Sequence, residues 1–136
     1  MVGPHPVVLL ERAVSANTVD AHRLTHLAAA HGRGAEMLER LLRAHLGEGE
    51  AVDDPCTLVR LGAEVGVPED EVRLMPDGDA YPGAVTADIR EARRYGATGV
   101  PFFVLDRAYG PSGAQPAGTF LTALRTAHAD TARARR

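Results

Sequence analysis

The chain has 136 residues, of which 45% are hydrophobic and 24% are charged, the balance of a single soluble domain. Its formal net charge of −3 excludes a strongly basic surface of the kind that binds nucleic acid, and no apolar run approaches the roughly 20 residues of a membrane-spanning helix. The start of the chain has no signal-peptide pattern, and the one cysteine, Cys56, excludes an internal disulfide. We therefore expect a cytoplasmic protein without nucleic-acid or membrane partners, and the Arg- and Ala-rich composition suggests a GC-rich, bacterial genome.

The chain up to Gly96 is predicted to be mainly helical after one short strand. Residues 7–10 form a short apolar run behind two prolines, which favours a strand. Helices are expected at 17–32, 35–47, 54–66 and 84–96, with a shorter helical turn at 67–75. Asn17 and Asp54 are expected to cap the first and third helices, because their side chains accept hydrogen bonds from the free N–H groups of a first turn. The second helix carries a wide apolar stripe that is expected to face the core: Met37, Leu38, Leu41, Leu42, His45 and Leu46.

The strand signal is concentrated between Gly96 and Pro116. The run from Phe102 to Leu105 is continuously apolar, so a strand covered on both faces is expected there. The sequence "DRAYG" that follows is typical of a hairpin turn, which would lead into a second, short strand. A last helix is expected from Pro116 to about Ala129.

Five segments occur here in the order in which one known family has them: "NTVDAHRL", "GAEVG", "GATGVPFFVLD", "YGPSGAQP" and "FLTAL". From Val7 to about Ala127 the chain resembles the DsbA-like thioredoxin-fold oxidoreductases. Within that family it is most similar to the FrnE-like branch, near the 2-hydroxychromene-2-carboxylate isomerases and the kappa glutathione transferases. The specific part of the resemblance is the combination of "GVPFF" and "SGAQ" after a helical insert.

The resemblance implies an α/β protein with a partial thioredoxin-like (DsbA-like) fold. Residues 1–136 would form a single domain. Within it, about 17–96 would be a helical insertion, and about 100–130 would be the C-terminal ββα half, a β-hairpin followed by a helix. The N-terminal βα(β) unit of the family would be missing.

The resemblance also implies a substrate-binding turn around Pro101. The family has a cis proline at this position, and the residue before it, here Val100 preceded by Gly99, offers backbone groups that pair with an extended peptide or with glutathione. A cis bond before proline costs only about 0.5–1 kcal/mol. Proline also lacks an N–H group, so it can open a strand without breaking the ladder of hydrogen bonds.

The chain departs from the family because it has no Cys-x-x-Cys. Dithiol chemistry needs a low-pKa thiolate beside a second thiol, and one cysteine cannot supply that pair. We therefore expect a truncated FrnE-like thiol–disulfide oxidoreductase that has no dithiol activity by itself. The reading frame upstream of Met1 would decide whether a Cys-x-x-Cys segment belongs to it.

Two other functions are open from the sequence. The first is a non-catalytic, thioredoxin-like module that binds a peptide or a partner chain, or forms a homodimer, through the sheet edge that the missing strands leave unpaired. The second is a relative of the glutathione-dependent isomerases and transferases. No cofactor is expected apart from the glutathione that this last function would use, and the substrate would be a peptide or a thiol.

Two further features are candidate sites. Cys56, in the first turn of the helix at 54–66, is a possible redox site or an incidental residue. His22 and His26 have the i, i+4 spacing of metal ligands, with His31 and Glu36 as conceivable additions, but we expect no metal.

The remaining candidates belong to segments of the resemblance. Ser112 and Gln115 either line the substrate cleft or satisfy backbone groups between a strand and a helix. The block of Asn17, Thr18, Asp20, His22 and Arg23 is either part of the cleft lining or a helix cap followed by a buried polar anchor.

Overall fold

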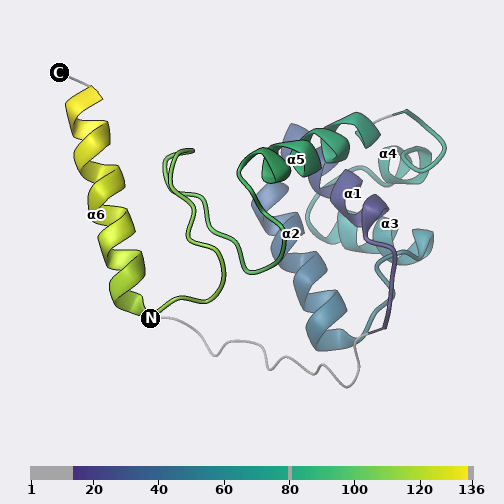
Figure 1. The fold of residues 1–136 in the computed structure, drawn as a ribbon. Helices are drawn as coiled ribbons and strands as arrows, with labels where there is room; N and C mark the ends of the chain where they lie inside the picture. Colours follow the sequence, from purple (N-terminus) through teal and green to yellow (C-terminus); the bar gives the residue numbers. More distant parts are fainter. Residues whose placement is uncertain (1–13, 80, 135–136) are drawn as a thin grey trace. The chain divides into compact units, whose positions relative to one another are not determined.

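The computed structural model describes residues 14–79 and 81–134, and Figure 1 traces its helices along the chain. The short strand expected at 7–10 lies outside the described residues. The chain divides into two compact units, Met1–Thr86 and Ala87–Arg136, which are described separately below. The prediction that both belong to a single domain stays a prediction.

The first unit is built from helices. Its elements are α1 (Val19–Ala30), α2 (Gly34–Arg43), the π-helix η2 (Ala44–Glu48), α3 (Pro55–Glu64) and α4 (Glu69–Leu74). Helix α5 (Pro82–Arg94) begins in this unit and crosses the division. α1 packs on α2 and α3, and α3 packs on α4. The expected helices are thus present, with shifted ends and with a π-turn in place of the last α-helical turn of the second helix.

The core of the first unit lies between α1, α2, α3 and α4. Its largest fully buried side chains are Leu24, Met37, Val52, Leu58, Leu61 and Val72. Burial of each such side chain stabilises the fold by about 1.5–3 kcal/mol relative to exposure. α3 approaches α4 closely at Gly62, where an added Cβ would lie 3.0 Å from Cγ2 of Val72. A glycine at this position therefore allows the two helices to pack.

The apolar stripe of α2 is narrower than the sequence predicts. Met37 and Leu41 are buried, whereas Leu38 is 46% and Leu42 is 50% exposed. Residues four apart lie on one face of a helix, and their next neighbours are rotated away from it by about 100°. α2 meets its neighbours over the face of Met37 and Leu41 only, so the prediction was wrong for Leu38 and Leu42.

The helix caps agree with the sequence at α3 and differ at α1. Asp54 accepts a hydrogen bond of 2.7 Å from the N–H of Thr57, which is the expected N-cap. At α1 the N-cap position falls on Thr18, and Asn17 instead accepts a bond of 3.1 Å from the N–H of Val19. The expected cap at Asn17 is therefore displaced by one residue, because its side chain closes a local turn ahead of the helix.

Arg23 is the buried polar anchor of the first unit. Its side chain is 8% exposed and pairs with Asp20 at 3.0 Å on the same helix. Its guanidinium also donates to the carbonyl oxygens of Met75, Pro76 and Gly78, the last at 2.7 Å. The forked donor geometry of arginine suits several acceptors at once. Arg23 thereby holds the end of α4 and the following loop against α1.

A chain of ion pairs joins α2, η2 and α3 at the surface. Arg40 donates to Glu48 at 2.9 Å and to Glu64 at 2.5 Å, and Arg60 pairs with Glu64 and Glu50. The hydrogen bond from Arg40 is the main reason that the pKa of Glu64 lies below its ordinary value. Burial by itself would lower the pKa of Arg40. The hydrogen bonds that Arg40 donates to Glu64 and Glu48 outweigh the effect of burial and raise that pKa. Charges shared in a network are worth more than isolated surface pairs.

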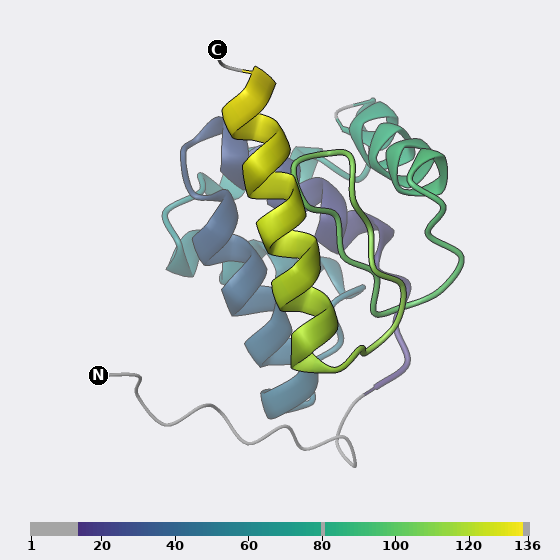
Figure 2. The ribbon, with the colours of Figure 1, turned by 60° about the vertical axis from the view of Figure 1, so that its left-hand side comes forward.

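The second unit consists of the end of α5, a hairpin-shaped segment and helix α6 (Ala117–Ala134). The hairpin runs beside α6 (Figure 2), and the rings of Phe103 and Phe120 meet edge to face with centroids 4.7 Å apart. Ala127 is the buried residue of α6. In the part of the chain that the structure describes, no helix is both long enough and apolar enough to cross a membrane.

The hairpin holds isolated bridges where the sequence predicts continuous strands. The two bridges are antiparallel and join Phe102 to Ser112 and Leu105 to Tyr109. The expectation that both faces are covered was also wrong, since Phe103 is 40% and Val104 is 39% exposed. A lone two-stranded hairpin is marginal without further strands or a covering layer. The described residues are accordingly mainly helical, and an α/β sheet is not formed within them.

We expect Arg23→Met to destabilise the first unit by about 2–4 kcal/mol, because the carbonyl oxygens of Met75, Pro76 and Gly78, and the carboxylate of Asp20, would lose their partner. Urea unfolding followed by circular dichroism measures this change. The matched control is Arg73→Met, since Arg73 is 66% exposed and pairs only along its own helix with Glu69. That control is expected to stay within about 0.5 kcal/mol of the parent. Equal unfolding midpoints for the two variants would contradict the anchor role of Arg23.

Candidate functional site

The candidate site is the turn at Val100 and Pro101 in the second unit. α5 ends at Arg94, and Gly96 follows in the left-handed region with φ of +85°. The N–H of Ala97 then bonds to the C=O of Ala92 at 3.1 Å, which closes the helix. The next residues lead out to Val100, whose side chain is 96% exposed.

The backbone at this turn is held on one side and open on the other. The peptide bond between Val100 and Pro101 is cis, the form that the resemblance implies. The C=O of Pro101 accepts a bond of 2.9 Å from the N–H of Gly113. Among the described residues, no hydrogen bond joins the N–H or C=O of Val100 to another group. Val100 therefore presents one donor and one acceptor to solvent, which is what a pairing backbone requires.

The structure places Ser112 opposite Phe102 and joins Gln115 to Ser112. Ser112 forms a bridge with Phe102, the residue directly after the proline. The side-chain Nε2 of Gln115 donates to the C=O of Ser112 at 2.9 Å. The sequence left two alternatives for Gln115, a place in the cleft lining or a bond to a backbone group. This contact corresponds to the second alternative. Whether Ser112 also contacts substrate stays a prediction.

The tip of the hairpin is tied to both helices of the second unit. Asp106 and Arg107 have φ of 50° and 57°, the left-handed pair typical of tight hairpin turns, so the predicted turn is confirmed. Arg107 donates to Glu91 and, at 3.2 Å, to the Tyr95 hydroxyl, both on or beside α5. On the other side, Thr131 of α6 donates to Asp106.

A second contact with α6 comes from Tyr109, whose hydroxyl donates to Asp130. This hydrogen bond is the main cause that raises the pKa of Tyr109 above its ordinary value. Bonds and charges from Tyr95 and then Glu91 likewise raise the pKa of Arg107. The sequence predicts the turn but none of these partners, because they lie in other elements and follow no spacing rule.

The histidines with metal-ligand spacing lie on α1 or directly after it. His22 is exposed on α1 in the first unit, and the ring of His26 stacks on Tyr81 with centroids 6.3 Å apart. His31 pairs with Glu71 at 2.9 Å, and Glu36 pairs with Arg33. Within residues 14–79 and 81–134, no group of three potential ligands comes together to hold a metal ion.

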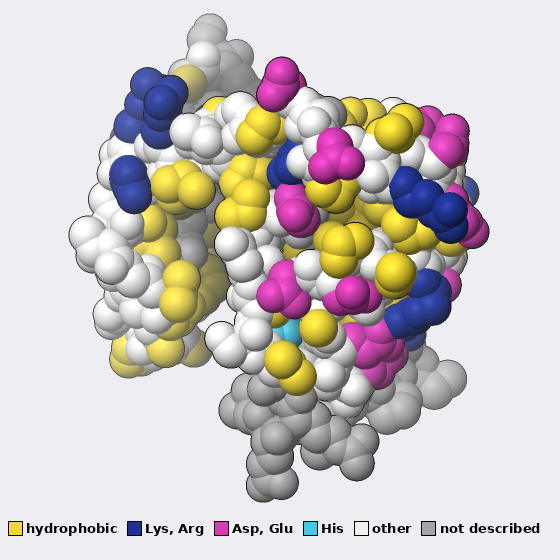
Figure 3. Space-filling model, turned by 90° about the vertical axis from the view of Figure 1, so that its right-hand side faces the viewer, with side chains coloured by type: hydrophobic (Ala, Val, Ile, Leu, Met, Phe, Trp, Pro, Cys, Tyr) yellow, Lys and Arg dark blue, Asp and Glu magenta, His cyan; other side chains and the backbone are white. Residues whose placement is uncertain are grey.

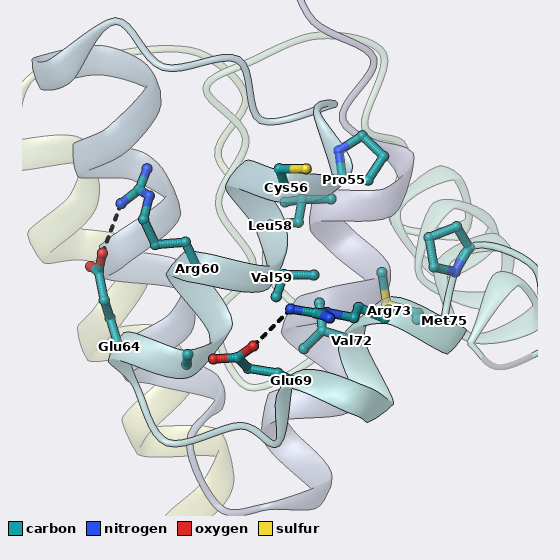
Figure 4. A pocket seen from close by; sticks show the side chains of 12 residues that line it. Pro55, Cys56, Leu58, Val59, Arg60, Glu64, Glu69, Val72, Arg73 and Met75 are labelled. Carbon is teal, nitrogen blue, oxygen red and sulfur yellow. Dashed lines mark hydrogen bonds and ion pairs between the residues drawn. The ribbon is translucent and has the colours of Figure 1, made fainter.

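Cys56 lines a cavity between α3 and α4 in the first unit (Figure 4). The cavity has a volume of about 690 Å³, and its floor is apolar, with Leu58, Val72 and Met75. The charged side chains at its rim pair with one another, Arg60 with Glu64 at 2.7 Å and Arg73 with Glu69 at 2.9 Å. The thiol of Cys56 is exposed, and a redox role for it stays a prediction.

On the face drawn in Figure 3, acidic, basic and hydrophobic side chains are interspersed. Such mixing is typical of a solvated protein surface.

Comparison with known proteins decides the family. The model of the DSBA-like thioredoxin domain matches residues 6–125, which include the turn at Val100 and Pro101. The chain belongs to the DSBA-like thioredoxin family.

Solved structures of one disulfide reductase resemble the chain. The cytosolic disulfide reductase DsbM from Pseudomonas aeruginosa, solved with GSH, is 28% identical with a TM-score of 0.61, over 89% of this chain and 59% of that one. A second structure of DsbM gives the same identity and TM-score over 60% of its chain. The chain thus spans about three fifths of the DsbM length. No curated protein sequence matches it.

Family membership confirms the DSBA-like part of the resemblance, and the FrnE-like branch stays a prediction. The family match covers the residues that follow α5. The resemblance places the expected substrate-binding proline turn in this part of the domain. The roles of Gly99, Val100 and Pro101 in that turn, and of His22 in a cleft, stay predictions.

We expect Tyr109 to ionise above the ordinary tyrosine value of about 10, because its O–H donates to Asp130. The stability that this bond contributes is present below pH of about 10 and is lost as pH rises through the raised pKa of the folded chain. Absorbance at 295 nm against pH measures the ionisation of the three tyrosines. Tyr109→Phe should remove a transition that lies above the ordinary tyrosine value, and the control Tyr81→Phe should leave that transition in place. A transition above the ordinary value that survives unchanged in Tyr109→Phe would count against this bond.

Proposed function

We propose that this chain supplies the helical insertion and the substrate-pairing turn of a DsbA-family thiol–disulfide oxidoreductase of the FrnE-like branch. The observation that carries the proposal is the turn at Val100, which lies inside the family match with both backbone groups unbonded among the described residues. Pro101 next to it brings no N–H group that would compete for a partner.

The turn would act by binding and orienting the substrate. An extended peptide would donate its N–H to the C=O of Val100 and accept from the N–H of Val100, as a strand adds to a sheet edge. The exposed Val100 side chain leaves that backbone accessible. Pairing of this kind recognises the main chain, so it tolerates many substrate sequences.

The exchange step itself needs two thiols. A thiolate attacks one sulfur of the substrate disulfide, forms a mixed disulfide and releases the other sulfur as a thiolate. The second thiol then attacks the mixed disulfide, so that the substrate gains two electrons and the enzyme is left with a disulfide. These 136 residues contain Cys56 alone and therefore cannot complete the cycle by themselves.

A glutathione-dependent activity is the second candidate. The observation that favours it is the DsbM structure solved with GSH, at 28% identity over 89% of this chain. Glutathione is a tripeptide, so it could pair with the backbone of Val100 in the same manner as a protein substrate. We also infer a cytoplasmic location, which is supported by the description of DsbM as cytosolic.

We expect the parent chain to bind reduced glutathione or a short extended peptide at Val100, with the amide signal of Val100 shifting in a titration followed by NMR. Val100→Ala keeps both backbone groups and is expected to bind as the parent does. Val100→Pro removes the N–H and is expected to bind about tenfold more weakly, the effect of one lost hydrogen bond. Preference for one ligand separates the two candidate functions. Absence of any shift with both ligands would refute the pairing role.

We expect the 136-residue chain to show no insulin reduction above background when dithiothreitol drives the assay, because a single thiol cannot alternate between dithiol and disulfide. The control is Cys56→Ser, which should give the same rate as the parent. Turnover in the parent that disappears in Cys56→Ser would show that Cys56 has an activity of its own.

A further inference from the structure

Gln115 stands at the junction between the hairpin and α6. Its side chain turns back along the chain, and Nε2 donates to the C=O of Ser112 at 2.9 Å. Gln115 is exposed and is followed by Pro116, after which α6 begins at Ala117. The backbone of Gln115 therefore lies two residues before the start of α6.

The hydrogen bond from Gln115 closes a loop around Gly113. Gly113 has φ of +80°, a conformation that residues with a side chain rarely adopt. A Cβ added there would find Nε2 of Gln115 at 3.8 Å as its one neighbour within 4 Å. The amide of Gln115 therefore spans the turn in which Gly113 sits.

Gly113 passes this constraint to the candidate site. Its N–H donates to the C=O of Pro101 at 2.9 Å. On the neighbouring residues, Ser112 forms its bridge with Phe102. The turn closed by Gln115 is thus bonded to the backbone of the residues directly after Val100.

We propose that Gln115 is a positioning residue for the substrate-pairing backbone of Val100, acting through Ser112 and Gly113. It holds the Ser112–Gly113 turn in the one conformation that directs the Gly113 N–H at Pro101, and so keeps the Val100 N–H and C=O turned to solvent. Gln115 contacts no substrate in this role. The effect of Gln115 on substrate pairing rests on the proposed function. The relay, meaning the hydrogen bonds from Gln115 to Ser112 and from Gly113 to Pro101, can be tested without it.

The relay depends on a donor at position 115, which separates it from simple packing. Gln115→Glu keeps the shape of the side chain but replaces the donor by a carboxylate that repels the Ser112 carbonyl. Gln115→Ala removes the side chain, and Gln115→Lys keeps a donor on a long stem. The relay predicts that Ala and Glu behave alike and that Lys resembles the parent.

Hydrogen exchange of single amides, followed by NMR on the whole chain, measures the relay directly. Exchange of the Gly113 N–H is expected to accelerate about tenfold in Gln115→Ala and Gln115→Glu and to stay within about twofold in Gln115→Lys. The internal reference is the N–H of Leu105, which bonds to Tyr109 at the other end of the hairpin and should not change. Parent-like exchange in Gln115→Glu, or an equal rise at Leu105, would overturn the proposal.

Binding of reduced glutathione and of the extended peptide is then measured on the same four proteins. The proposal expects weaker binding in the Ala and Glu variants and parent-like binding in the Lys variant. Equal binding in all four, despite faster exchange at Gly113, would overturn the positioning role. If the parent binds neither ligand, the proposed function fails, and the exchange pattern still decides whether Gln115 controls the turn.

Discussion

The buried guanidinium of Arg23 is the contact on which the closure of the helical unit depends. It joins α1 to carbonyl oxygens more than fifty residues further along the chain, with a separation of 55 positions from Arg23 to Gly78. Apolar packing of Leu24, Leu61 and Val72 brings the helices together but does not select a loop path. A buried charge without partners costs several kcal/mol, so the loop after α4 has to present its oxygens to Arg23.

The second unit is organised differently, by polar contacts around a hairpin. Its buried core is small, with Ala127 as the buried residue of α6, and its apolar hairpin side chains stay partly exposed. Arg107 and Tyr109 fasten the hairpin to α5 and α6 by hydrogen bonds with Glu91 and Asp130. A segment held in this way can keep its backbone extended and accessible. That is the property that a strand-pairing site needs.

The candidate site follows from the contrast between bonded and unbonded backbone groups. Pro101 is held at its carbonyl by Gly113, and Gln115 closes the turn that carries Gly113. Val100 has no such partner among the described residues. On the proposed function, the chain would carry one half of a thiol–disulfide exchange site, the half that holds the substrate main chain. The chemistry of sulfur would have to come from thiols other than the single Cys56.

The sequence by itself determined the family, the helices and the place of the proline turn, because these depend on local spacing, on caps such as Asp54 and on a contiguous motif. It could not determine that Leu38 and Leu42 face solvent, or that the apolar run from Phe102 forms bridges without a covered strand. Burial depends on which neighbours a face meets, and periodicity does not record that. The tertiary structure alone decided that Arg23 binds the loop after α4 and that Gln115 turns back to Ser112, since a polar side chain takes whichever acceptor the folded chain brings within reach.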